Sequence, residues 1–198
     1  MTKALSAFLI AVMFMVCGCG SHGPQNLRTD APPRELKPPA AVEDDIAVFF
    51  SPGGGGMAEL INEINHAQKS IDIMAYVITT HEIADPLAAA MKRGVQVRVI
   101  MDASNAGGLF SDKEIFAYNP VPIWMDDKHK EFHHKVMLID GKVLITGSFN
   151  FTTQAEDTNG ENLLIIRNHP KLYGAYQAQF NLHLEHSKPP AGVNIATK

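Results

Sequence analysis

The chain has 198 residues, of which 45% are hydrophobic and 19% charged, enough apolar material for one folded domain with processed ends. This composition excludes a wholly disordered chain and any coiled-coil or collagen architecture. The formal net charge of -4 carries no global signature of a nucleic-acid-binding protein. Both cysteines, Cys17 and Cys19, lie close to the N-terminus, so neither a disulfide scaffold nor a cysteine-based zinc site is expected.

The N-terminus has the pattern of an export signal. Lys3 precedes a short apolar run at 4–16, and small residues follow it. The run is shorter than the roughly 20 residues of a membrane span. Residues 16–19 (VCGC) resemble a bacterial lipobox, which predicts a signal peptide over residues 1–18 and Cys19 as the lipidated first mature residue. A conventional cleavage nearby would instead release a soluble periplasmic protein, and an uncleaved signal would itself form the anchor. The expected location is the periplasm or the outer membrane.

Residues 19–42 are expected to form a tether behind the lipobox cysteine. The segment carries five prolines among small and polar residues and cannot bury enough apolar surface to fold. Without residues 1–42 the chain keeps 13 basic and 19 acidic residues, a balance of about -6, so its folded part is more acidic than the whole. We expect one catalytic domain over residues 43–190 and a tail at 191–198.

Strand and helix patterns alternate after the tether. Strands are expected at 46–50, 71–78, 95–101, 135–139, 142–146 and 162–167, and helices at 57–69, 80–93 and 170–185. Thr79 or Thr80 can cap the second helix, Gly94 can end it, and Pro86 should bend it. Segment 103–120 is expected to be loop with a short helix. The alternation predicts an α/β fold with a mixed, mostly parallel sheet flanked by helices on both faces.

Reactive side chains gather around one predicted hairpin. Asp140 and Gly141 are a favoured turn pair between two apolar strands. His133 and Lys135 are two residues apart and share a face, whereas His134 points away and is expected to be structural. The returning strand brings Ser148 and Asn150 back beside them. A histidine, a fixed cation, a hydroxyl and an amide suit chemistry at a phosphate. No carboxylate cluster typical of Mg²⁺ or Ca²⁺ accompanies them, so no metal or other cofactor is expected.

These residues resemble a known motif. The pattern H-x-K-x4-D-x6-G-S-x-N is met without a gap by His133, Lys135, Asp140, Gly147, Ser148 and Asn150. It is the HKD motif of the phospholipase D superfamily, and the likeness to small Nuc-type bacterial endonucleases extends over residues 45–186. The resemblance implies the superfamily's sandwich of a sheet between helices. One motif in so short a chain is also the arrangement of the mitochondrial cardiolipin-hydrolase relatives.

The resemblance implies a covalent phosphohistidine mechanism. Nuc-type enzymes form a two-fold homodimer with both motifs at one shared site, so His133 of one subunit would attack phosphorus. His133 of the partner subunit would protonate the leaving oxygen. Lys135 and Asn150 would hold the phosphate oxygens, with Ser148 at the edge. Glu161 matches a glutamate of the family that would hydrogen-bond His133 and fix its tautomer.

The remaining motif positions are expected to be structural. Asp140 is more structural than catalytic in the family, and its place in a tight turn is a sufficient explanation. Gly147 belongs to the motif's backbone. A metal site at His129, His133 and His134 lacks a matching carboxylate or cysteine set and is not expected. Residues 128–130 (KHK) form either a solvated loop or a local phosphate-attracting patch. The run at 53–56 (GGGG) lacks the ending of a phosphate loop and indicates a flexible turn.

Three functions follow from this pattern. The first is a metal-independent phosphodiesterase of the Nuc type that cleaves DNA, with RNA as a further substrate class. The second is a phospholipase D or cardiolipin hydrolase that acts on membrane phospholipids, as a lipid anchor at Cys19 would favour. The third is a non-catalytic envelope protein that binds phosphate-rich polymers. The partners expected are therefore a second copy of the chain, a nucleic acid or phospholipid substrate, and the membrane that holds the anchor.

Overall fold

The computed structural model describes residues 40–43, 45–105 and 121–189. The expected signal peptide, Cys19, nearly all of the tether and the tail at 191–198 lie outside the described residues. Most of segment 103–120, with its expected short helix, lies outside them too; residues 103–105 form a 3-10 turn. In the part of the chain that is described, no helix has the length and apolar character that a membrane crossing requires.

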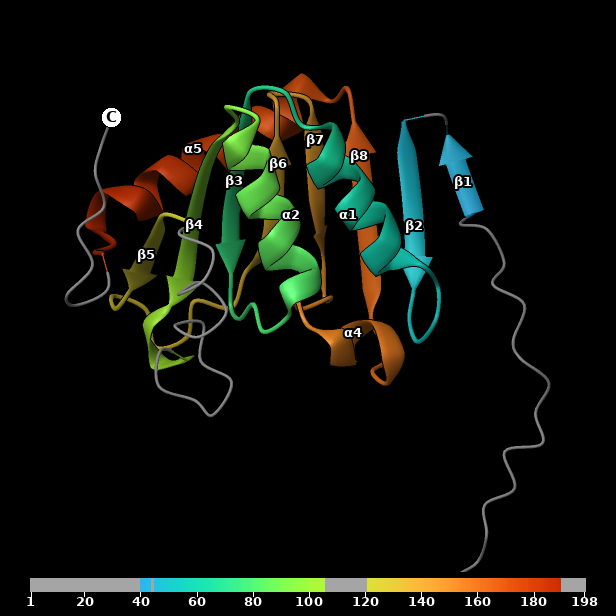
Figure 1. Ribbon diagram of the computed structural model, residues 1–198, viewed down its shortest axis with the longest axis horizontal. Helices are drawn as coiled ribbons and strands as arrows, with labels where there is room; N and C mark the ends of the chain where they lie inside the picture. The colour runs from blue at the N-terminus through green and yellow to red at the C-terminus, as the bar shows by residue number, and fades with distance from the viewer. Residues whose placement is uncertain (1–39, 44, 106–120, 190–198) are drawn as a thin grey trace, which may run out of the picture. The chain divides into compact units, whose positions relative to one another are not determined.

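An eight-stranded sheet, in the order β1-β2-β8-β7-β6-β3-β4-β5, forms the centre of the described chain (Figure 1). Its strands are β1 Ala40–Glu43, β2 Ile46–Phe50, β3 Ser70–Ala75, β4 Gln96–Asp102, β5 Ile123–Asp126, β6 Lys135–Ile139, β7 Val143–Gly147 and β8 Asn162–Arg167. The expected mixed sheet is confirmed. The expectation that most pairings are parallel is wrong, because only β3–β4 and β4–β5 pair in parallel. The other neighbouring strands all pair antiparallel.

Helices cover both faces of the sheet, as predicted. The described helices are α1 Gly56–His66, α2 His81–Lys92, α4 Thr153–Asp157 and α5 Pro170–His186. Helices α1 and α2 lie on one face and α5 lies on the other (Figure 1). Thr80 caps α2 as expected, since its Oγ1 accepts a hydrogen bond from the backbone N–H of Glu82 at 3.3 Å. Gly94 follows α2 at a φ of +93°.

Three elements were not expected from the sequence. Strand β1 begins at Ala40, so residues 40–42, which were expected to belong to the tether, lie instead in a strand that pairs with the edge of β2. Strand β5 has four residues and follows a proline-containing segment, which hides its periodicity. Helix α4 has five residues, and its start is fixed by Thr152, whose Oγ1 accepts from Ala155 N. Short elements of this kind are held by their neighbours more than by their own periodicity.

Two apolar cores hold the layers together. The larger lies between the sheet and the pair α1 and α2, where Leu60, Ile64 and Leu87 are completely buried. The smaller lies under α5, which packs Tyr173 and Phe180 on the opposite face. Completely burying one such aliphatic side chain contributes about 1.5–3 kcal/mol. The central strands are therefore apolar on both faces, which explains why a run of apolar residues could not reveal the direction of their pairing.

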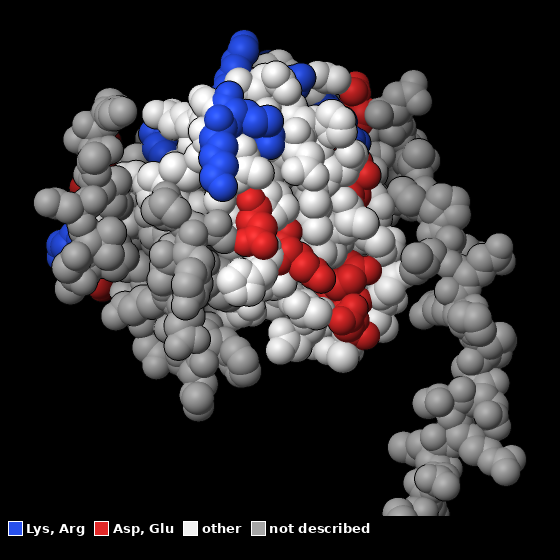
Figure 2. All heavy atoms as spheres, in the orientation of Figure 1, with Lys and Arg blue, Asp and Glu red and all other residues white. Residues whose placement is uncertain are grey.

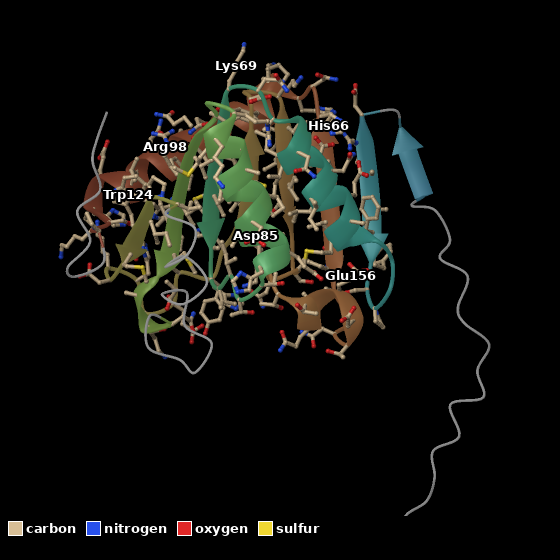
Figure 3. The ribbon with its side chains drawn as sticks, in the orientation of Figure 1. His66, Lys69, Asp85, Arg98, Trp124 and Glu156 are labelled. Carbon is tan, nitrogen blue, oxygen red and sulfur yellow. The ribbon has the colours of Figure 1, made fainter. Side chains whose placement is uncertain are left out.

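A polar network also fastens α5 to the sheet. Arg98 donates two hydrogen bonds to the carboxylate of Asp72, at 2.7 and 2.6 Å, and Asp72 is only 2% exposed. Gln177 of α5 donates to the same carboxylate at 2.8 Å. The guanidinium carbon of Arg98, labelled in Figure 3, lies 4.9 Å from the ring centroid of Phe180. The buried charge is thus paired and hydrogen-bonded, as a buried carboxylate requires.

The β6–β7 hairpin turns at Asp140 and Gly141, as predicted. Both residues have positive φ, +57° and +80°, and Lys142 N donates to Ile139 O at 3.0 Å. The Asp140 carboxylate accepts backbone N–H groups at 2.7 to 3.0 Å from Gln68, Lys69 and Ser70. It therefore fixes the segment that leads into β3.

Candidate active site

The ends of four central strands meet at one end of the sheet. Ala75, the last residue of β3, is paired with Lys135, the first residue of β6. Gly147, the last residue of β7, is paired with Leu163 near the start of β8. Because the β6–β7 hairpin joins these pairs, the segments that carry His133 and Ser148 lie at the same end of the sheet. The predicted placement of both segments at one end of the sheet is thus confirmed.

Tyr76 packs against both leading residues of the motif. Its ring centroid lies 4.7 Å from that of His133, with the ring planes at 65°. Lys135 Nζ lies 4.9 Å from the Tyr76 ring centroid and donates to the backbone oxygen of His133 at 3.3 Å. His133 itself is exposed. Tyr76, to which sequence reasoning gave no role, therefore orients an accessible imidazole beside a fixed cation.

Lys135 is 7% exposed, an unusual degree of burial for a lysine. This burial lowers the pKa of its ammonium group, while the charges of Glu161 and Glu131 act to raise it. The neighbouring carboxylates thus favour the cationic form that a phosphate would contact.

His134 lies on the opposite face, as expected. Its ring centroid is 4.8 Å from that of Phe132 and 5.3 Å from that of His183. Burial lowers its pKa, and the neighbouring charge of His129 lowers it further. The side chain therefore belongs to the packing under the end of α5 and not to the face that carries His133.

Glu161 has different partners from the one expected. Its Oε2 accepts from Ser148 Oγ at 2.5 Å and its Oε1 accepts from Asn159 Nδ2 at 3.1 Å. Ser148 Oγ in turn accepts from Asn162 N at 3.1 Å. Within the described chain Glu161 forms no hydrogen bond with His133, because both carboxylate oxygens are held here while the imidazole packs on Tyr76. Glu161 therefore orders the Ser148 side of the site.

Two further motif residues shape the site without reactive groups. Gly147 has a φ of +151°, and a Cβ there would lie 2.2 Å from the backbone oxygen of Asn162. Only glycine permits this approach of β7 to β8. Asp140 lies at the far end of β6 from His133, with its carboxylate bound to backbone N–H groups. Gly147 therefore allows β7 to approach β8 closely, and Asp140 holds the backbone of residues 68–70.

Asn150 carries an unsatisfied atom. Its Oδ1 and His183 Nδ1 are the buried side-chain nitrogen or oxygen atoms that lack a hydrogen-bond partner among the described residues. An unpaired buried polar group costs about 1–3 kcal/mol, so each one calls for an explanation such as a ligand. Asn150 lies three residues after Gly147, the last residue of β7. The unpaired Oδ1 therefore lies toward the same end of the sheet as His133 and Lys135.

The charge toward this end can be followed on the face that α1 and α2 cover. On the face covered by α1 and α2, the Lys and Arg side chains in Figure 2 gather at one end of the molecule, where Lys69 lies in Figure 3. Acidic side chains lie over α2 and toward α4, where Asp85 and Glu156 are labelled. On this face the basic groups are thus remote from the active-site end. Phosphate binding would rely on local donors such as Lys135.

The glycine-rich turn is not a phosphate loop. The carboxylate of Glu156 accepts from Gly55 N and Met57 N, both at 2.9 Å, at the start of α1. A protein carboxylate thus already occupies the N-terminus where a phosphate would bind. Lys128 and Lys130 are exposed on the loop that follows β5, where Lys128 N and His129 N donate to Asp126 Oδ1. The ordered loop backbone is compatible with either interpretation of these lysines.

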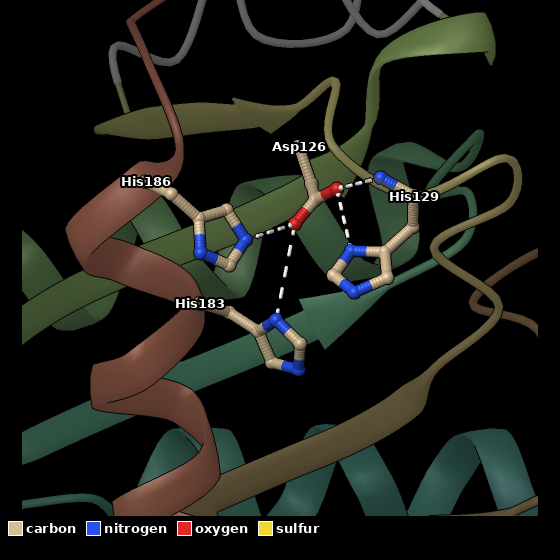
Figure 4. A group of neighbouring side chains, drawn as sticks. All are labelled: Asp126, His129, His183 and His186. Carbon is tan, nitrogen blue, oxygen red and sulfur yellow. Dashed lines mark hydrogen bonds and ion pairs between the residues drawn. The ribbon is translucent and has the colours of Figure 1, made fainter.

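A second group of titratable side chains lies away from the HKD residues. Asp126, His129, His183 and His186, here named the Asp–His cluster, offer one potential ligand atom each, all within 4.8 Å of one another (Figure 4). The histidine triplet considered from the sequence does not form. His133 packs on Tyr76, whereas His134 lies on the other face, with its ring 5.3 Å from that of His183. In the sequence, the spacings D-x-x-H at 126–129 and H-x-x-H at 183–186 are the signal from which this cluster could have been predicted.

Burial and hydrogen bonding set the charge states of the Asp–His cluster. Burial acts to raise the pKa of Asp126, but hydrogen bonds from His129 and His186 outweigh it and hold that pKa below its ordinary value. Burial lowers the pKa of His183 to about 4, with further lowering by His134 and His129. The cluster thus combines a carboxylate with a neutral, buried imidazole at neutral pH.

Comparisons with known proteins agree with the motif. Residues 60–184 match the family model described as cardiolipin synthase, PLD-like domain. The chain is 33% identical over 125 residues, 63% of its length, to a mitochondrial cardiolipin hydrolase of Chlamydomonas reinhardtii. It is 36% identical over 125 residues to a phospholipase D of Rickettsia felis. These matches span 56% and 62% of the length of the two curated relatives.

A solved structure covers more of the domain. Nuc from Salmonella typhimurium, a phospholipase D family member, superposes with a TM-score of 0.69 and 33% identity. The match covers 73% of this chain and 96% of that one. The family model spans well over half of this sequence. The fold agrees with that of Nuc, and the HKD motif lies within the residues that the family model matches. The chain belongs to the phospholipase D superfamily, with a single PLD-like domain.

Proposed function

We propose that the chain is a phosphodiesterase that cleaves DNA through a covalent phosphohistidine on His133, without a metal ion in the chemical step. The observation that carries this proposal is the exposed His133 imidazole held by Tyr76 beside the buried ammonium of Lys135. The fold match, which covers 96% of the Nuc chain at 33% identity, supports a substrate of the Nuc type.

The chemistry follows from the groups present. A ring nitrogen of His133 attacks phosphorus, and the P–O bond to the leaving alcohol breaks as the P–N bond forms. Lys135 and Asn150 would stabilise the negative charge on the non-bridging oxygens. Water then attacks the phosphohistidine, which releases the second product and restores the imidazole. A general acid is needed for the leaving oxygen, and a general base is needed for the water.

A second copy of the chain would supply this acid and base. The described chain brings one histidine, His133, to the Lys135 face, since His134 packs on the other side. In a two-fold dimer, the partner subunit's His133 would protonate the leaving oxygen and later accept the proton of water. Two copies would also double the local positive charge from Lys135. A monomeric mass in solution together with full activity would contradict this dimer.

Phospholipids are the second candidate substrate. The relatives named phospholipase D and mitochondrial cardiolipin hydrolase favour it, and so would the lipid anchor proposed at Cys19. We propose that this anchor holds the exported enzyme at the periplasm or outer membrane. The described side chains visible in Figure 2 form no broad basic surface toward the active-site end of that face, and so favour neither DNA nor phospholipid.

The test compares substrates under one condition. Tag-free full-length protein, kept below its melting temperature, is incubated in EDTA with plasmid DNA, single-stranded DNA, RNA, and vesicles of phosphatidylcholine or cardiolipin. We expect DNA cleavage by the wild type and a loss of at least 10³-fold in His133→Ala, which removes the nucleophile. A quench in alkaline denaturant, which preserves the acid-labile P–N bond, should trap phosphohistidine in the wild type and none in that variant.

The outcomes separate the candidates. Release of phosphatidic acid without DNA cleavage would identify the phospholipase. Binding of DNA with no turnover and no phosphohistidine in the wild type would indicate the non-catalytic alternative. Equal cleavage by His133→Ala would show that a contaminating nuclease is responsible.

A further inference from the structure

The Asp–His cluster joins two parts of the fold that are distant in sequence. Asp126 ends β5 and His129 lies on the loop that leads toward the HKD residues, whereas His183 and His186 are in the last turns of α5. Next to them, Met125 and Lys188 pair their backbones, with N···O distances of 2.7 and 3.1 Å. Figure 4 shows the three imidazoles turned toward the Asp126 carboxylate.

We propose that the Asp–His cluster binds a divalent transition-metal ion of the zinc class, which clamps the end of α5 to the loop before His133. Three imidazoles and one carboxylate are a donor set that such ions accept, and four protein ligands complete a tetrahedral, structural site. The site goes beyond the phosphodiesterase activity, because it lies on the opposite side of β6 from the His133 face.

The distances fit a single ion. Asp126 Oδ1 lies 2.9 Å from His129 Nδ1, and Asp126 Oδ2 lies 2.8 Å from His186 Nε2 and 3.8 Å from His183 Nδ1. Ligand atoms of a tetrahedral zinc site, at bonds of about 2.0–2.1 Å, are separated by about 3.3 Å. The observed separations lie on both sides of this value, so side-chain shifts of under about an ångström would suffice.

The three rings are also arranged around one centre. Their centroids are 5.1, 5.4 and 5.7 Å apart for the pairs His129–His183, His183–His186 and His129–His186. Imidazoles bound through nitrogen to one tetrahedral zinc place their centroids roughly 5 Å apart. A ring packing that served only to fill space would not need to direct three nitrogens at one carboxylate.

An unpaired atom points to the ligand. His183 is 4% exposed, and its Nδ1 has no hydrogen-bond partner although it faces Asp126. Hydrogen bonds between Asp126 and the other two histidines satisfy the carboxylate but leave this nitrogen unused. The other nitrogen, Nε2, lies 2.7 Å from the amide nitrogen of Gln179. A half-turn of this amide on metal binding would bring its oxygen to Nε2, so that Nε2–H donates and the Nδ1 lone pair is left for the ion.

The test uses tag-free full-length protein stripped of metal by a chelator. Zinc is titrated in competition with a chromophoric chelator, and the melting temperature is followed by circular dichroism. We expect one zinc per chain and a rise in melting temperature of about 5–10 °C at a free zinc concentration about 100 times Kd. Cobalt at the same site should give the intense visible absorption of tetrahedral coordination.

Variants assign the site to its residues. His129 is 43% exposed, so His129→Ala removes a donor with little disturbance of the core, and zinc affinity should fall at least tenfold. His183→Gln should abolish the zinc-induced shift if it folds. His169→Gln changes an exposed histidine at the other end of α5 and should keep full binding.

Zinc binding and phosphodiesterase activity can be tested independently of each other. His133→Asn lacks the proposed nucleophile and should still bind zinc with the affinity of the wild type. Zinc binding that is absent from the wild type, or equally tight in His129→Ala and the wild type, would overturn the proposal whatever the activity of either protein.

Discussion

The aspartate that gives the HKD motif its last letter should matter for stability and not for chemistry. Lys135 begins β6 and Asp140 directly follows its last residue. At about 3.4 Å per residue of strand, the two residues are roughly 17 Å apart. The Asp140 carboxylate accepts three backbone N–H groups from residues 68–70. We therefore predict that Asp140→Asn lowers the free energy of unfolding and leaves kcat within about twofold of the wild type.

The size of the effect follows from these hydrogen bonds. Asparagine tolerates the φ of +57° at this turn, so the substitution adds little backbone strain. It does replace one acceptor oxygen by an NH₂ group that faces N–H donors. Hydrogen bonds to a charged group contribute about 1.5–3 kcal/mol, and partial exposure of Asp140 screens them. We expect a loss of about 1–2 kcal/mol and a melting temperature lower by about 3–8 °C.

The pH dependence has a definite sign. Burial acts to raise the pKa of Asp140, but the three backbone donors outweigh it and hold the pKa below its ordinary value. A lowered folded-state pKa contributes stability that is complete above the unfolded pKa and is lost as pH falls through the folded pKa. The difference in stability between wild type and Asp140→Asn should thus be full at pH 7 and narrow below about pH 4.

Urea unfolding at several pH values and turnover of a p-nitrophenyl phosphodiester measure the two quantities. Asp157→Asn, a change of an exposed aspartate in α4, is the matched control and should alter neither. The reasoning would be refuted by an Asp140→Asn protein of unchanged stability whose kcat falls more than tenfold while it is fully folded.

Three other changes probe the active-site end. Gly147→Ala should unfold at a temperature lower by several degrees, because the added Cβ would collide with the backbone oxygen of Asn162. Unchanged stability would show that β8 can shift away from the added Cβ without cost. Lys135→Gln should reduce kcat for the p-nitrophenyl phosphodiester by about 10²–10³ with a normal unfolding transition, whereas a change confined to KM would mean that the lysine only binds substrate. Phe50 is 64% exposed and pairs with Asn162 in the β2–β8 ladder. Phe50→Ala should raise KM about tenfold for single-stranded DNA through loss of base stacking, and should leave the small phosphodiester unaffected; equal effects on both substrates would exclude a contact with the bases.

Much of the fold could be predicted because most of its strands and helices have a signal in their own sequence, such as a turn pair, a cap or an apolar period. The Asp140–Gly141 turn and the apolar runs around it predict the β6–β7 hairpin, and the Thr80 cap and Gly94 bound α2. Pairing direction could not be predicted in this way, because strands buried on both faces carry the same apolar residues whether they run parallel or antiparallel.

The motif side of the site was predictable for a related reason. Fixed spacing along one hairpin determines which side chains share a face, so His133 and Lys135 could be placed together from the sequence. Contacts between distant segments could not. Tyr76 reaches His133 from the end of β3, and the Asp–His cluster needs β5 beside the end of α5. Residues that lie far apart in sequence reveal such neighbours only when the sheet order is known.

The position of α5 has a consequence for the order of folding. Among the described helices, α5 covers the smaller core, and it lies at the C-terminal end of the described chain. Until α5 packs on the sheet, the chain exposes Met74, Ile100 and Leu138, and the Asp72 carboxylate lacks its contact with Gln177. Strands β1 to β8 can therefore be complete while one whole face is still open and prone to association. A chain truncated before residue 170 would keep every residue of the HKD motif and still be a target for chaperones and proteases.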